Sequence, residues 1–369
     1  MGYERRNRDT RRRPQRHQGR WAACWRYVVA QRPRIKTTVV GSYPMPDWLV
    51  ALPSEQAVLD ATRVVIHTQE KAGIDLVCDG ELSRFDVNHP ETNGMIEYFV
   101  KPMAGIRSAV TFDELLGYRA QRGMGFRTRP PAVVDGPIGS GTLDLPQACN
   151  RAKHLASHPF KFTLTGPHML AKTLIDRHYK SLPDLTMSIA AALAEQVAHL
   201  DADVVQIDEA NLPGNPDEWQ WAAAAINRVL DAVKTLPAVH LCFGNYGGQS
   251  IQKGAWTKLI DYLNALHVDH IVMETAHRPQ EELAVFRDLR PEIGFGLGVV
   301  DIKSTEIESA DHVARMIERA ESVIGQDRIA YIHPDCGFWM LKRSIADGKI
   351  RALVAGRDLF EGRRGAHAA

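Results

Sequence analysis

The chain has 369 residues, with 45 lysines and arginines against 44 aspartates and glutamates, and 44% of its residues are hydrophobic. This length allows one large α/β barrel or two smaller domains, and the sequence contains no apolar run long enough to cross a membrane. Its five cysteines include no C-x-x-C pair, so a disulfide-stapled secreted fold is disfavoured and a cytoplasmic protein is expected.

The first 34 residues differ from the rest in charge, because they hold eleven arginines, no lysine and two acidic residues. They show no pattern that could join a core, so we expect a disordered tail or translated sequence upstream of the true start. A nucleic-acid arm or a transit peptide is the alternative interpretation. The remainder has an excess of acidic residues, which makes nucleic acid an unexpected partner for it. Residues 363–369 are expected to form a short C-terminal tail.

From residue 35 onward, β-rich runs alternate with helical patterns. The predicted strands are 36–41, 74–78, 161–164, 204–207, 238–243, 270–273, 293–300 and 329–332. The predicted helices are 55–72, 185–200, 218–235, 256–266, 280–289, 310–324 and 338–346. Several strands are apolar without alternation, which is typical of parallel strands covered on both faces.

Eight strands joined by helices predict an α/β fold with a single (β/α)8 TIM barrel over residues 35–362. The interval 83–160 lies between the second and third strands and is too long for one connection. We therefore expect an insertion there with short strands of its own.

Polar residues occur at the C-terminal ends of the predicted strands, where the catalytic residues of barrel enzymes lie. They are Ser42, Asp79, Glu81, Asp208, Glu209, His240, Cys242, Glu274, Asp301, Asp335 and Cys336.

Four of these residues predict a zinc site. His240 and Cys242 point to the same face because side chains on a strand alternate, and Glu274 and Cys336 complete a ligand set suited to zinc. Ligands from three separate strands favour a catalytic ion. Two thiolate ligands lower the Lewis acidity of zinc, so it activates water poorly. A zinc ion with these ligands is still well suited to bind a substrate thiol as the thiolate. Glu274, the hard ligand, is expected to leave as that sulfur enters.

Other candidate ligands have simpler interpretations. Cys78 and Cys149 are expected to be ordinary buried or loop thiols, Cys24 lies in the basic segment, and His333 is expected to have a structural or supporting role. A non-catalytic barrel that binds metal or docks a corrinoid remains an alternative of another class.

Motifs along nearly the whole barrel resemble the catalytic barrel of cobalamin-independent methionine synthases. They are G-S-Y-P (41–44), D-G-E-L-S-R (79–84), M-I-E-Y-F (95–99), L-T-G-P (164–167), Q-I-D-E (206–209), H-L-C (240–242), M-E-T (273–275) and H-P-D-C-G (333–337). The resemblance implies that His240, Cys242, Glu274 and Cys336 bind zinc and that Ser42, Glu81 and Asp208 bind homocysteine. Carboxylates suit its ammonium, and the Ser42 hydroxyl suits its carboxylate.

The chain also departs from the folate-dependent members of that family. It is about half their length, it has no aromatic residue at 168–173, and Lys303 stands where their strand-seven motif has a histidine. In these respects it resembles the short folate-independent methionine synthases. The implied function is zinc-dependent methyl transfer to homocysteine, or to another small thiol, from methylcobalamin or a methylated corrinoid protein. Glu274, Asp301 and Lys303 are the further catalytic candidates.

An epoxyalkane:coenzyme M transferase is the alternative within the same fold. Its zinc would activate a thiol that carries a sulfonate, which ionised Glu81 and Asp208 would repel. Lys303 keeps this interpretation open because it could pair with the sulfonate or with the alkoxide of an opened epoxide.

Overall fold

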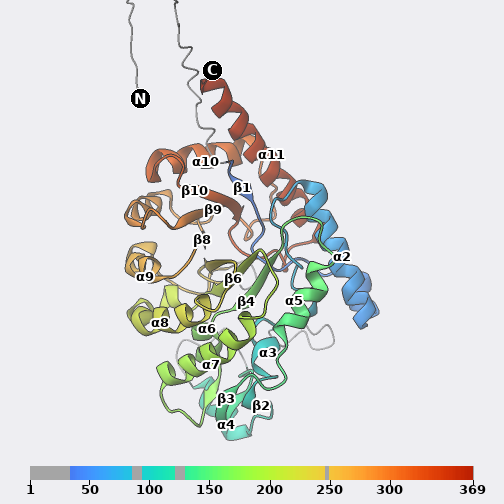
Figure 1. Ribbon diagram of the computed structural model, residues 1–369, viewed down its shortest axis with the longest axis vertical. Coiled ribbons are helices and arrows are strands. Elements are labelled where there is room, and N and C mark those ends of the chain that lie inside the picture. The colour runs from blue at the N-terminus through green and yellow to red at the C-terminus, as the bar shows by residue number, and fades with distance from the viewer. Residues whose placement is uncertain (1–33, 85–93, 121–128, 246–248, 369) are drawn as a thin grey trace, which may run out of the picture. The chain divides into compact units, whose positions relative to one another are not determined.

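The computed structural model describes residues 34–84, 94–120, 129–245 and 249–368 (Figure 1). The chain divides into two units, Met1–Pro33 and Arg34–Ala369. The expected basic tail therefore lies, but for Arg34, outside the described residues. Everything below concerns the second unit.

A parallel seven-stranded sheet forms the centre of this unit, in the order β1-β10-β9-β8-β7-β6-β4. Its strands are β1 (Lys36–Thr37), β4 (Lys161–Thr165), β6 (Val204–Glu209), β7 (Leu236–Leu241), β8 (His270–Met273), β9 (Gly294–Val300) and β10 (Ile329–Pro334). Most of their residues are buried, as the unalternating apolar runs predict. The predicted α/β class with a parallel sheet is confirmed.

The segment predicted as the second strand, 74–78, does not form a regular strand. Its Leu76 pairs singly with Thr38 and its Val77 with Phe160, both in parallel, so it bonds to the two edges of the sheet. A longer ladder is prevented because the Asp75 carboxylate accepts the Thr37 amide at 2.8 Å, an amide that a continuous ladder would use.

Helices surround this sheet in Figure 1. The longer ones are α2 (Glu55–Ala72), α7 (Leu182–Val197), α8 (Trp219–Leu230), α10 (Ala310–Ile324) and α11 (Arg343–Ala368). Shorter elements are α1 (Asp47–Ala51), α6 (Pro167–Thr173), α9 (Ile260–Ala265), η2 (Leu212–Gly214), η3 (Pro216–Glu218), η4 (Trp256–Lys258) and η5 (Gln280–Asp288).

Local chemistry explains where α2 begins and ends, because the Ser54 side chain accepts the Ala57 amide and Gly73 follows in a left-handed conformation. Three predicted helices differ from the structure. The segment predicted as one helix over 256–266 divides into the 3-10 helix η4 and the short α9. The segment at 280–289 is a 3-10 helix. The closing helix begins at Arg343 rather than 338, since the Phe338 amide donates to the Ser42 carbonyl at 2.8 Å instead. It then continues to Ala368, through the expected C-terminal tail.

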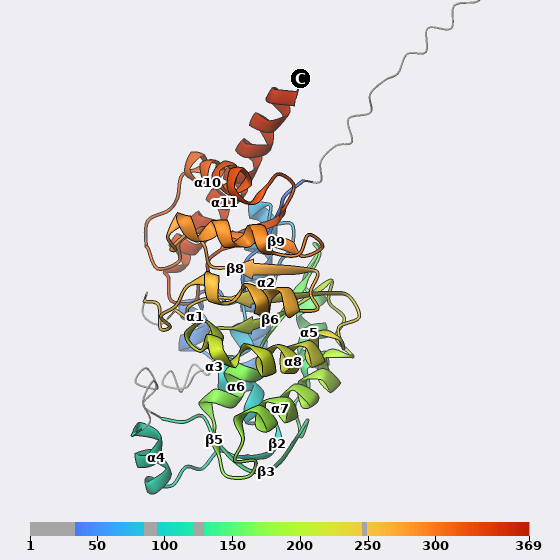
Figure 2. The ribbon, with the colours of Figure 1, turned by 90° about the vertical axis from the view of Figure 1, so that its left-hand side faces the viewer.

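The interval 83–160 includes two short strands, as expected. The interval begins within η1 (Leu82–Arg84). It then contains α3 (Gly94–Val100), β2 (Ala104–Arg107), α4 (Phe112–Arg119), β3 (Val133–Gly139) and α5 (Leu145–Lys153). Strand β3 pairs with β2 and with β5 (Ile175–Asp176) in a separate three-stranded sheet. Figure 2 shows β2, β3 and α4 at the end of the unit far from α10 and α11.

A search of the described residues for a membrane-crossing helix, one with the necessary length and apolar character, finds none.

Candidate active site

The ends of adjacent strands bring the predicted site residues together. Asp208 on β6 lies opposite His240 on β7 in the sheet register, and His240 lies opposite Val272 on β8. Residues that are opposite in register project to the same face of a sheet. Asp208 and His240 therefore share one face.

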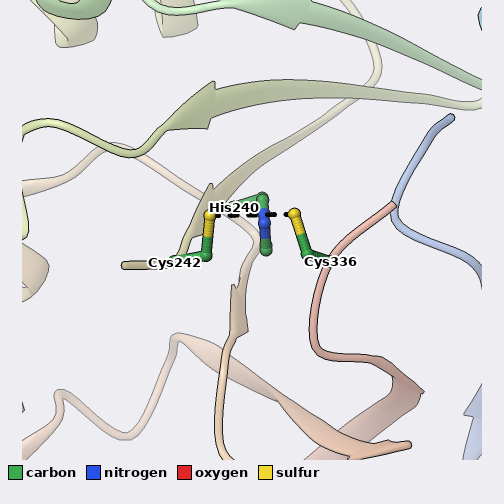
Figure 3. A group of neighbouring side chains, drawn as sticks. All are labelled: His240, Cys242 and Cys336. Carbon is green, nitrogen blue, oxygen red and sulfur yellow. Dashed lines mark hydrogen bonds between the residues drawn. The ribbon is translucent and has the colours of Figure 1, made fainter. Parts of the chain in front are cut away.

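His240, Cys242 and Cys336 form a group whose ligand atoms all lie within 4.8 Å of one another. Figure 3 shows the three side chains pointing toward one another, with Cys336 approaching from the loop after β10. The Nδ1 atom of His240 lies 2.9 Å from the Val272 carbonyl, which assigns the ring proton to Nδ1. Its buried Nε2 has no hydrogen-bond partner among the described residues. An orphaned imidazole nitrogen beside two sulfurs fits zinc.

The two sulfurs lie 3.8 Å apart, within hydrogen-bonding distance, and either could be the donor. The hydrogen bond from Cys242 holds the pKa of Cys336 well below its usual range. The same hydrogen bond, together with burial, raises the pKa of Cys242 well above its usual value. These surroundings favour the thiolate form of Cys336, the form that binds a metal.

Glu274, the fourth predicted ligand, lies outside this three-residue group. Its Oε1 lies 2.9 Å from the Lys303 Nζ atom, and its Oε2 accepts the Phe243 amide, also at 2.9 Å. The Lys303 side chain is 2% exposed and that of Glu274 is fully buried. The structure therefore pairs two of the catalytic candidates with each other.

Backbone geometry presents Glu81. This residue has φ 59 and follows Gly80 with φ 71, and the Asp79 carboxylate accepts the Glu81 amide at 2.9 Å. Gly41 leaves room for the side chain, because a Cβ atom there would lie 2.1 Å from the Glu81 Oε1 atom.

The carboxylates of Glu81 and Asp208 each keep one oxygen available. Thr163 and Arg84 both approach Oε1 of Glu81, and Gln206 donates to Oδ1 of Asp208 at 2.7 Å. The described residues offer no donor to the other oxygen of either group. Burial raises the pKa of Glu81 to about 7; the Arg84 charge opposes this rise and the nearby Asp208 carboxylate adds a smaller contribution to it. Burial likewise raises the pKa of Asp208 to about 6.

A chain of hydrogen bonds supports Asp208 from within the sheet. Lys161 donates to the Gln206 side-chain oxygen at 2.6 Å, and the Gln206 amide nitrogen donates to Asp208. Sequence reasoning missed Lys161, Gln206, Thr163 and Arg84. The available signal was polar residues at alternate positions of otherwise apolar strands, with Arg84 closing the D-G-E-L-S-R motif.

Ser42 contacts the segment of the chain that carries Cys336. A Cβ atom on Gly337 would lie 2.0 Å from the Ser42 Oγ atom, so the hydroxyl packs against the backbone immediately after Cys336. The side chains of Ser42, Glu81 and Asp208 are each less than a tenth exposed.

Asp301 lies beside this site. Its Oδ1 accepts the Lys303 amide at 2.8 Å and its Oδ2 lies 3.1 Å from His277 Nδ1. Asp335, to which the sequence assigned no role, accepts the amides of Thr275, Ala276 and His277. It therefore holds the loop that follows Glu274.

The remaining thiols and His333 have structural surroundings. Cys78 and Cys149 are buried free thiols, as predicted, and Cys78 donates to the Gly41 carbonyl at 3.0 Å. His333 is buried with its Nδ1 atom 2.8 Å from the Pro334 carbonyl.

Comparisons with known proteins agree with these features. The family described as "Cobalamin-independent synthase, Catalytic domain" matches residues 35–356. A methionine synthase from Thermococcus kodakarensis is 30% identical over 346 residues, covering 89% of this chain and 94% of the relative. One from Sulfurisphaera tokodaii is 28% identical over 340 residues, covering 88% and 92%.

A solved structure is also similar. It is a B12-independent methionine synthase from Shewanella sp. W3-18-1 in complex with selenomethionine, with a TM-score of 0.73 and 25% identity, covering 90% of this chain and 100% of that one. These relatives give the coenzyme M transferase interpretation no support. The chain therefore belongs to the cobalamin-independent methionine synthase family, matched through its catalytic domain, and is a methyltransferase.

Proposed function

We propose that this methyltransferase methylates the sulfur of homocysteine in a zinc-dependent reaction whose methyl donor is not a folate. The observation that carries the proposal is the contact between Ser42 and Gly337, because it links the residues proposed to hold an amino acid with the His240–Cys242–Cys336 group. The Shewanella relative is described as a complex with selenomethionine, an amino acid of the same shape as methionine.

The protein's own residues position the acceptor. The free oxygens of Glu81 and Asp208 receive the homocysteine ammonium, and the Ser42 hydroxyl donates to its carboxylate. An arriving ammonium favours the ionised form of both acids, which offsets the burial that raises their pKa values. The substrate sulfur then lies toward Cys336.

Zinc held by His240, Cys242 and Cys336 would supply a Lewis acid that keeps the substrate sulfur deprotonated at neutral pH. The thiol proton leaves, the bond between the methyl group and the donor breaks, and a carbon–sulfur bond forms. The donor keeps the electron pair of the broken bond, so the exchange is balanced without an oxidant.

The inference of a non-folate donor rests on the first turn of α6. His168 at this turn lies 2.7 Å from Glu218 and 3.3 Å from Glu209, and its ring packs 5.1 Å from that of Trp221. Residues 168–173 include no phenylalanine, tyrosine or tryptophan on which a pterin could stack. Methylcobalamin or a methylated corrinoid protein is therefore the proposed donor.

We further propose that 74–78 closes the sheet into a (β/α)8 barrel that carries 83–160 as an insertion. The bridges of this segment to both sheet edges support closure.

A donor panel tests this function. Zinc-loaded enzyme and homocysteine are incubated with methyltetrahydrofolate or methylcobalamin, each carrying a deuterated methyl group, and labelled methionine is followed by mass spectrometry. We expect label from methylcobalamin, much less from the folate, and none from Cys336→Ser. Equal labelling from the folate would disprove the donor assignment. A parallel reaction with equal amounts of homocysteine and coenzyme M tests the acceptor, and label in methyl-coenzyme M rather than in methionine would disprove the acceptor assignment.

A further inference from the structure

Arg84 lies buried against the carboxylate of Glu81. Its Nη1 atom lies 3.3 Å from the Glu81 Oε1 atom, and the two side chains are 1% and 2% exposed. Its Nη2 atom donates to the Thr163 carbonyl at 2.6 Å, while the Thr163 hydroxyl donates to the same Glu81 oxygen. A cation and a hydroxyl therefore hold one oxygen of Glu81, and the described residues offer no donor to the other.

Three aromatic rings pack against the guanidinium of Arg84. Their centroids lie 5.3–5.8 Å from its Cζ atom, and the rings are those of Phe162, Phe99 and Tyr98. Attraction between a cation and these ring faces helps to hold the side chain in place. Its Nη1 atom has no hydrogen-bond partner among the described residues, so the contact with Glu81 is mainly an attraction between opposite charges.

Glu81 needs a nearby positive charge because it is buried among other acids. Burial raises its pKa to about 7, the Arg84 charge opposes this rise, and the Asp208 carboxylate adds to it. The remaining ionisable groups that face Glu81 from neighbouring parts of the fold are those of Asp79, Cys78 and Lys161.

Arg84 supplies a positive charge that persists across the neutral range. Burial raises the pKa of Cys78 to about 12, so this thiol stays neutral, and burial lowers the pKa of Lys161 to about 8. Burial alone would also lower the pKa of Arg84, but the charges of Glu81 and the nearby acids outweigh it and raise that pKa instead. Removing the Arg84 charge would therefore favour the protonated, neutral form of Glu81.

We propose that Arg84 is a positioning residue that acts through Glu81: its charge lets this buried carboxylate ionise near neutral pH, so that the free oxygen receives the ammonium of the amino-acid acceptor. Arg84 makes no contact with the acceptor in this role. Without its charge, Glu81 would have to release a proton to solvent as the ammonium bound, and affinity would fall wherever protons compete. The inference rests on the proposed acceptor, and it adds a residue behind the acceptor pocket.

The pH dependence of methionine binding tests the role of Arg84. Methionine, the product of the proposed reaction, carries the same ammonium and carboxylate as homocysteine but no thiol, so the titration of a ligand thiol does not enter. Its affinity for the zinc-loaded enzyme is measured by calorimetry between about pH 6 and pH 8.5. We expect Arg84→Gln to bind methionine about tenfold or more weakly than the wild type at pH 6, and this loss should shrink at least about fivefold by pH 8.5, because an opposite charge nearby lowers the pKa of a carboxyl by about 1–3.

Three further variants separate this effect from general damage. Arg84→Lys keeps a positive charge beside Glu81 and should retain the pH dependence of the wild type. In the Glu81→Gln background, Arg84→Gln should cause no further pH-dependent loss, because the group that titrates is gone. Arg357→Gln removes another buried arginine, 2.6 Å from Asp75 and bonded to the Ile35 carbonyl before β1 begins. It should lower the melting temperature and leave methionine affinity unchanged at every pH.

Two results would overturn the inference. One is a loss of methionine affinity in Arg84→Gln that has the same size at every pH, which would show that Arg84 only supports the fold. The other is a folded Arg84→Gln enzyme that binds methionine as the wild type does. Should Arg84→Gln fail to fold, Arg84→Lys decides. An unchanged pH dependence supports the inference, and a displacement of about one pH unit or more despite the retained charge overturns it.

Infrared difference spectra follow the Glu81 carboxyl group without any ligand. Its band is identified by its absence from Glu81→Gln. The midpoint of its titration should lie about one pH unit or more higher in Arg84→Gln than in the wild type, and near the wild-type value in Arg84→Lys. Equal midpoints in the wild type and Arg84→Gln would overturn the inference. If methionine fails to bind the wild type at any pH, the proposed acceptor is rejected, and this titration still decides the role of Arg84.

Discussion

Replacing Gly41 with alanine should weaken homocysteine binding about ten- to a hundredfold. The new Cβ atom would lie 2.1 Å from the Glu81 Oε1 atom and 2.9 Å from its Cδ atom, too close for either to stay in place. Because the clash is with the end of a side chain, the carboxylate can move while the backbone stays. Its displacement removes a charge-assisted hydrogen bond to the substrate ammonium, about 1.5–3 kcal/mol, which corresponds to that range of affinity.

Isothermal titration calorimetry of the zinc-loaded enzyme with homocysteine measures this effect, and thermal melting reports on the fold. Gly117→Ala is the matched control, because a Cβ atom at Gly117 in α4 meets nothing within 4 Å. That variant should bind homocysteine normally and be slightly more stable, by up to about 1 kcal/mol. A Gly41→Ala enzyme with wild-type homocysteine affinity would show that Glu81 does not contact the substrate.

Three further predictions concern charge, metal and the N-terminal segment. Because burial raises the pKa of Glu81 to about 7 and of Asp208 to about 6, the folded enzyme binds more protons than the unfolded chain between about pH 4 and 7. Stability without substrate should therefore fall as the pH rises through that range while homocysteine affinity rises, and Glu81→Gln should flatten both pH profiles. Cys242→Ser and Cys336→Ser should each lose most of their bound zinc by metal analysis; full retention in both would disprove the site. Deleting residues 1–33 should leave melting temperature and activity nearly unchanged, and a large drop in either would show that the segment docks.

The sequence predicts the central architecture well where burial on both faces leaves an unbroken apolar run. Strands β6, β9 and β10 lie within a few residues of their predicted positions. The segment at 74–78 has the same apolar character, but the bond from the Thr37 amide to Asp75 limits it to isolated bridges. A side chain that competes for a backbone amide leaves no periodic signal in the sequence.

The sequence does not predict which side chains pair with the site residues, because the paired residues come from distant parts of the chain. Strand-end position and ligand chemistry together select His240, Cys242 and Cys336, which the structure brings together. They also select Glu274, but its pairing with Lys303 depends on which side chains meet across the loops after β8 and β9. The support of Asp208 by Lys161 likewise requires the register of β4 with β6.

The left-handed backbone at Glu81 limits how acceptor preference could be redesigned. With φ 59 at this position and φ 71 at Gly80, the main chain itself aims the side chain, so only residues that tolerate this conformation can substitute without strain. Aspartate and asparagine satisfy that condition, whereas valine, isoleucine and threonine would each cost about 1–3 kcal/mol. A library that seeks new thiol acceptors should therefore keep position 81 to that narrow set and vary Ser42 and Asp208 instead, where the backbone imposes no such restriction.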